Sequence, residues 1–184
     1  SLGIIDIDCV IVDKVFASCQ QRECFPEVEV ELDDCTFGRI RFRPGFIVPN
    51  TLTITDIENR PQFRRVQFTL RVPYEIIYTD GTSEEKFLSN ILKDIVLFIP
   101  DARDEFTFEI IIETFSKTLG MPIVASGKVS FAVGVFLIVK VVGRVQLLIQ
   151  TFGFCPEPIE CGDFSQKDIC DNFEYEPFPD AFDD

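Results

Sequence analysis

Apolar and polar residues alternate along most of this chain, and this alternation predicts β-strands. In the first twelve residues the apolar positions that share one strand face are Ile5, Ile7, Cys9 and Ile11. This segment precedes any turn that could fold it back onto the chain. It is therefore expected either to form an ordinary first strand or to add, as a donor strand, to the open sheet edge of a neighbouring copy.

The same alternation continues through the middle of the chain. It predicts strands at 28–32, 37–42, 52–57, 66–72, 74–78 and 106–112. Asp80-Gly81 predicts a type I′ hairpin turn, because both residue types tolerate a positive φ. Residues 85–99 also fit helical spacing, and we expect strand there. Residues 123–154 contain three basic residues and no acidic one, which favours two long strands, the second at about 141–154, buried on both faces or against a neighbouring subunit.

Many strands with turn signals between them and little helix predict an all-β fold. The expected architecture is an antiparallel, jelly-roll-like β-sandwich. We divide the chain into an N-terminal arm (1–15), a sandwich domain (16–154) and an irregular acidic tail that contains cysteines (155–184).

Composition and charge narrow the function. The 184 residues include 20 Phe but no His and no Trp. Without His the chain lacks the commonest general base and metal ligand, so we expect no enzyme, no cofactor and no metal site, although catalysis by carboxylates or Lys stays open. Of the net charge of −14, the last 30 residues contribute −9, from ten acidic residues and one Lys. An acidic chain disfavours nucleic acid and membrane insertion.

Seven cysteines are many for a chain of this size, and they favour disulfides formed in an oxidising compartment. They are Cys9, Cys19, Cys24, Cys35, Cys155, Cys161 and Cys170. None is arranged as the paired C-x2-C of a zinc ribbon. The number is odd, so at least one is left after pairing within the chain. We expect Cys9 to bridge two subunits, and the alternative is that it is a small buried apolar residue.

Other groups of residues give weaker indications of function. Glu27, Glu29 and Glu31 share one strand face, which is more typical of a solvated surface than of a calcium site or a glycosidase pair. Nucleophile and phosphate-loop motifs are absent from the sequence. The absence of Trp also disfavours a sugar-binding platform.

Residues 12–24, Val-Asp-Lys-Val-Phe-Ala-Ser-Cys-Gln-Gln-Arg-Glu-Cys, resemble a segment of clostridial spore-surface proteins of the SPOCS-type spore-coat domain family. Residues 72–78, followed by Asp80-Gly81, fit the strand pattern of that family. The resemblance implies a subunit of a spore coat, exosporium or spore appendage. Such a protein is made in the mother cell without a signal peptide and acts at the spore surface, outside the cell.

The sequence thus predicts a structural subunit of a self-assembling, disulfide-stabilised extracellular filament or coat. Its partners are expected to be copies of itself and other surface-layer proteins, joined through addition of the N-terminal strand. The alternative is a monomeric β-sandwich module that binds a carbohydrate or another surface ligand.

Overall fold

The computed structural model describes residues 8–32, 36–101, 107–149 and 157–160. These residues contain ten strands and no helix, which confirms the all-β prediction. The strands are β1 (Asp8–Glu31), β2 (Phe37–Phe42), β3 (Phe46–Ile47), β4 (Thr53–Asp56), β5 (Phe63–Arg71), β6 (Pro73–Tyr78), β7 (Ser83–Phe87), β8 (Ile91–Phe98), β9 (Phe108–Ala125) and β10 (Lys128–Ile149).

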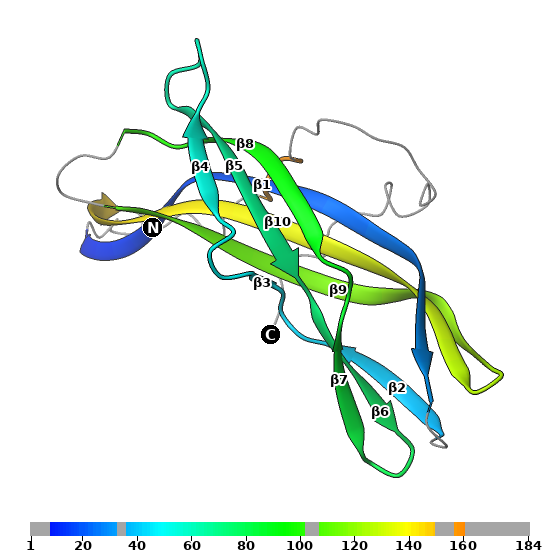
Figure 1. Ribbon diagram of the computed structural model, residues 1–184. Helices are drawn as coiled ribbons and strands as arrows, with labels where there is room; N and C mark the ends of the chain where they lie inside the picture. The colour runs from blue at the N-terminus through cyan, green and yellow to red at the C-terminus, as the bar shows by residue number, and fades with distance from the viewer. Residues whose placement is uncertain (1–7, 33–35, 102–106, 150–156, 161–184) are drawn as a thin grey trace.

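The strands form three antiparallel sheets arranged as a sandwich. The long sheet has the order β1-β10-β9 and runs the whole length of the molecule (Figure 1). A small sheet has the order β2-β6-β7, and in a four-stranded sheet β5 pairs with β3, β4 and β8. The four-stranded sheet lies across the long sheet (Figure 1). The small sheet packs against the long sheet through Tyr74, whose ring centroid lies 5.8 Å from that of Phe131.

The core lies between these layers and follows from the period-2 pattern. Alternate residues of β10, from Val129 to Val141, point into the sandwich and are buried. Val66, Leu70 and Ile95 face them from the four-stranded sheet and are also buried. Each fully buried aliphatic side chain of this kind contributes about 1.5–3 kcal/mol relative to an exposed one, so the apolar alternation is the main force that fixes the register.

The long strands differ from the prediction. β10 is a single strand of 22 residues, so the expected break before residue 141 is wrong. The strand continues through Gly143. Because this residue has no side chain, it leaves room for the Phe16 ring, which would lie 3.0 Å from a Cβ at this position. β1 is likewise one strand of 24 residues. It changes register between Val15 and Ala17 and again between Phe25 and Val28, where Pro26 needs no ladder hydrogen bond.

The expected hairpin at Asp80-Gly81 joins β6 to β7, and residues 91–98 of the ambiguous segment form a strand. The turn is not a type I′ turn centred on Asp80-Gly81. The N–H of Gly81 donates to the carbonyl of Tyr78, so Thr79 and Asp80 are the central residues, and Gly81, which follows them, has a positive φ of 88°. Asp80 instead accepts hydrogen bonds from the backbone N–H and the hydroxyl of Thr82. Pro73 lies where the chain passes from β5 in one sheet to β6 in another.

Candidate assembly surface

One end of the long sheet narrows to a two-stranded ribbon. The ladder between β9 and β10 ends at the pair Phe108–Gly143, whereas β1 continues to pair with β10 as far as Asp8–Ile149. We call residues 8–14 of β1 and 143–149 of β10 the terminal ribbon. An isolated two-stranded ribbon is only marginally stable in water. The stability of the terminal ribbon therefore depends on its attachment to the sandwich and on contacts along its strand edges.

Large apolar side chains of the terminal ribbon are exposed. Ile11 is 64% exposed and Leu148 is 71% exposed. Cys9 lies opposite Leu148 and Ile11 lies opposite Gln146, so these residues share one face. Diagonal neighbours across a strand pair are within reach of each other, and Ile11 and Leu148 therefore form one apolar patch.

The ribbon is attached to the sandwich through aromatic packing at its base. Phe16, at the register change in β1, packs edge-on against Phe108, with ring centroids 4.9 Å apart. Gly143 makes this pair possible, since a Cβ there would lie 3.0 Å from Phe16 and 3.3 Å from Phe108. The Nζ of Lys14 lies 4.9 Å from the centroid of the Phe16 ring. The ribbon therefore leaves the sandwich from a packed base.

The terminal ribbon is electrically balanced on an acidic chain. Its charged residues are Asp8, Asp13, Lys14 and Arg144, two acidic and two basic, whereas the whole chain has a net charge of −14. Asp13 and Arg144 are cross-strand partners. Two copies of an acidic protein repel each other least where the surface is neutral, and the ribbon is such a surface.

A second apolar surface lies at the opposite end of the long sheet, at the β9–β10 hairpin (Figure 1). Met121, Ile123 and Val124 are exposed there, by 88%, 68% and 54%. The turn itself is tight, because Ser126 and Gly127 both have a positive φ, of 52° and 72°. We call residues 119–130 the hairpin end.

Between these two ends, another segment of the chain covers the edge of β1 at Gln20 and Arg22. The N–H of Gln20 donates to the carbonyl of Ile159 at 3.2 Å, and Gln20 and Glu160 form a parallel bridge. Arg22 also pairs with Glu160, at 2.6 Å. Proteins protect edge strands from unwanted pairing by such coverage. Among the described residues this contact lies at the middle of β1, and neither residues 8–14 nor residues 25–31 have a ladder partner other than β10.

The predicted cysteines fall into different environments. Cys9 is free and exposed, and its Sγ accepts a hydrogen bond from the Nε2 of Gln146 at 3.0 Å. Cys19 and Cys24 are disulfide-bonded, Cys19 in the core and Cys24 half-buried. They cannot bridge each other, because five residues of extended strand separate their Cα atoms by about 16 Å. Cys35, Cys155, Cys161 and Cys170 lie outside the described residues.

The donor-strand prediction is only partly covered by the structure. Ile5 and Ile7 lie outside the described residues. Ile11 lies in β1 and pairs within its own chain, opposite Gln146. The expected boundary between an arm (1–15) and a domain (16–154) falls inside β1, at the register change after Val15.

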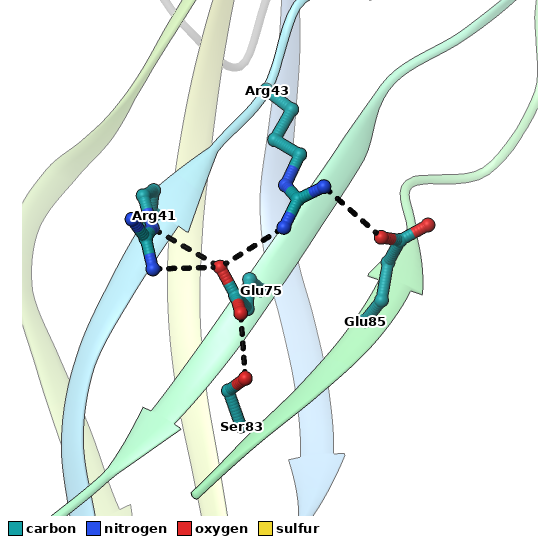
Figure 2. A network of polar contacts seen from close by, with 5 residues as sticks. All are labelled: Arg41, Arg43, Glu75, Ser83 and Glu85. Carbon is teal, nitrogen blue, oxygen red and sulfur yellow. Dashed lines mark hydrogen bonds and ion pairs between the residues drawn. The ribbon is translucent and has the colours of Figure 1, made fainter. Parts of the chain in front are cut away.

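The carboxylates of the described residues are held in ion pairs or face solvent. Glu75 of β6 is buried and accepts hydrogen bonds from Ser83 and Arg41, while Arg43 bridges Glu75 and Glu85 (Figure 2). The Ser83 hydrogen bond, and then the two guanidiniums, hold the pKa of Glu75 below its ordinary value in spite of burial. This network joins β2, β6 and β7. Glu27, Glu29 and Glu31 are exposed, as expected of a solvated face.

Comparisons with known proteins add no family assignment. No protein family model, no curated protein sequence and no solved structure matches this chain. Within the described residues no three Cys, Asp or Glu side chains gather closely enough to hold a metal ion. The same residues contain no helix that could cross a membrane.

Proposed function

We propose that this chain is a structural subunit of a self-assembling, disulfide-stabilised filament or coat outside the cell. The spore surface is the proposed location, and this part rests on the resemblance of residues 12–24 and 72–78. The observation that carries the proposal is the pair of exposed apolar surfaces at opposite ends of the long sheet, the terminal ribbon and the hairpin end.

A linear assembly needs two contact surfaces on every subunit. The ribbon exposes Ile11 and Leu148, and the hairpin end exposes Met121 and Ile123. Large apolar side chains concentrated at such sites are typical of protein contacts. The long sheet connects the two surfaces by continuous ladders of hydrogen bonds, so it would act as the stiff element between successive joints.

In this account the N-terminal strand acts as part of the terminal ribbon. From residue 8 onward β1 is already paired with β10, so the ribbon as a unit adds to the sheet of a neighbour. The disulfides of Cys19 and Cys24 stabilise β1, and a disulfide of this kind contributes about 2–4 kcal/mol. The exposed thiol of Cys9 is the candidate for a bridge between subunits.

The test is negative-stain microscopy of purified protein with one end altered at a time. Ile11→Lys alters the ribbon, Ile123→Lys alters the hairpin end, and Leu92→Lys is the control, because Leu92 is 81% exposed on β8, away from both ends. Wild type and control are expected to form extended multimers, and each end variant is expected to stop at small oligomers. Multimers that form equally well in all four proteins would contradict the proposal. A monomeric wild type would favour a binding module.

A further inference from the structure

We propose that the terminal ribbon pairs edge to edge with the same ribbon of a second copy, antiparallel, around a two-fold axis at Ile11. This inference rests on the proposed function and names the partner of one of its two surfaces. In the described residues β1 is an edge strand of the long sheet, and residues 8–14 have no ladder partner other than β10. The second copy would turn two three-stranded sheets into one continuous six-stranded sheet.

The sequence of the edge selects the axis. When two identical strands pair antiparallel around a two-fold axis, residues at equal distances on either side of the axis lie opposite each other and on the same face. With the axis at Ile11, this residue meets its own counterpart and Val10 meets Val12. The aspartate at position 8 comes opposite Lys14, and the symmetry makes this pair twice. Apolar and opposite-charge cross-strand pairs are both stabilising.

Neighbouring axes lack this complementarity. An axis at Val12 places Ile11 opposite Asp13 and Val10 opposite Lys14. An axis at Asp13 brings two copies of the same carboxylate together, and like charges directly opposite each other are destabilising. An axis at Val10 places Val12 opposite an aspartate. The axis at Ile11 alone among these gives every apolar residue from 10 to 12 an apolar partner.

The two-fold contact would also cover exposed apolar surface of the terminal ribbon. Ile11 is 64% exposed in the single chain, and its counterpart would cover the side that faces the open edge. Cys9 would lie opposite Asp13 of the second copy, so the two Cys9 residues would be four positions apart, or about 13 Å. That is too far for a disulfide, and Cys9 would remain available to a copy outside the pair.

Site-directed disulfide formation tests the axis. The variant Ile11→Cys in a Cys9→Ser background places one thiol at the axis, and oxidised glutathione accepts the two electrons and two protons that a thiol pair loses. The control is Leu92→Cys in the same background, which presents a thiol on β8 at a position that is 81% exposed, more than Ile11. We expect covalent dimers of the Ile11 variant to form on the order of tenfold faster or more, because pairing raises the local thiol concentration. Equal rates would overturn the axis.

A charge exchange tests the register without adding a thiol. Lys14→Asp and Asp8→Lys would each place like charges opposite each other twice, so each is expected to weaken dimerisation on the order of tenfold. The double variant restores both pairs and is expected to dimerise like the wild type. Single variants that dimerise normally, or a double variant that does not recover, would overturn the register. Circular dichroism confirms that each variant is folded.

These outcomes separate this inference from the proposed function. Filaments without Ile11→Cys dimers would contradict the two-fold contact and leave the assembly proposal standing. Dimers through Ile11→Cys without any larger multimer would support the contact and contradict the filament or coat. Cross-linking of wild-type chains through Cys9 within the ribbon contact would contradict the axis at Ile11.

Discussion

The Nζ of Lys93 forms an ion pair with Oε1 of Glu23 across the interior of the sandwich. Lys93 occupies an inward position of the edge strand β8, between the buried residues Ile91 and Ile95, and only 5% of its side chain is exposed. Glu23 projects from β1, the edge strand of the opposing layer, and is 33% exposed. An inward-pointing charge is a known protection of sheet edges against pairing, so this ion pair protects β8 and the part of β1 around Glu23, outside the terminal ribbon.

The two partners of this ion pair are expected to respond unequally to substitution. Glu23→Gln leaves the ammonium of Lys93 buried without its carboxylate, and we expect a loss on the order of 3 kcal/mol in the free energy of unfolding. Lys93→Met removes the buried charge and leaves a partly hydrated carboxylate, so it is expected to be close to neutral. Urea denaturation measures both. An equal loss of unfolding free energy in the two variants would contradict this expectation, which rests on the unequal burial of Lys93 and Glu23.

The Glu75 network predicts a pH dependence of stability. The pKa of Glu75 is lowered from its ordinary 4.5 in the folded chain, so the unfolded chain takes up the proton more readily. The stabilisation is therefore present above about pH 4.5 and is lost as the pH falls through the folded-state pKa. Glu75→Gln is expected to be less stable than wild type at pH 7, with the difference shrinking below pH 4.5. Glu58→Gln, at an exposed site, is the control, and a difference that stays constant with pH would contradict the argument.

Gly38 is required at the register change of β2. A Cβ at this position would lie 2.7 Å from the backbone carbonyl oxygen of Ile77, which cannot move aside without disturbing β6. Gly38→Ala is therefore expected to cost about 1–3 kcal/mol. The comparison is Gly81→Ala, where the new methyl meets nothing within 4 Å and only the positive φ opposes it. Thermal unfolding that ranks Gly81→Ala as the more damaging would show that β2 adapts to the extra carbon.

The Phe16–Phe108 pair is expected to control the order of the terminal ribbon. Phe16→Ala removes the ring that packs at the base, whereas the ladder of residues 8–14 is left intact. We expect faster amide hydrogen exchange in residues 8–14 and little change in the core residues 129–141. Phe46→Ala serves as the control, because Phe46 also forms an edge-on aromatic pair, with Phe87, away from the ribbon. Unchanged exchange in the ribbon would contradict the role of Phe16.

Much of the fold could be predicted from the sequence because period-2 alternation reports directly on strands. It located β2 and β5, and it placed Cys9 and Ile11 on one face. The lengths of β1 and β10 could not be predicted in this way. In the sequence, Gly143 indicates an interruption of a strand. In the structure, the absence of a side chain at Gly143 leaves room for Phe16 and Phe108. Whether a glycine interrupts a strand or makes room for a neighbouring side chain depends on how residues distant in the sequence pack against it.

The candidate surface was predicted in part. The N-terminal strand and Cys9 were expected to form a joint, and Cys9 lies in the terminal ribbon with residues 8–12, the part of that strand within the described residues. Ile123 and Val124 of the hairpin end belong to a run without acidic residues that was expected to be buried on both faces or against a neighbouring subunit, and in the single chain they are exposed. Leu148, in the same run, is likewise exposed in the single chain. Burial depends on which strands lie alongside, and β9 ends before it can cover the ribbon.

The most direct test of the central claim, that this chain assembles through the ends of its long sheet, is sedimentation velocity of the wild-type protein over a rising concentration series. The account predicts a sedimentation coefficient that increases with concentration, and Ile11→Lys should shift this increase to higher concentrations. A single species with the 21.0 kDa mass of one chain at every concentration would contradict it.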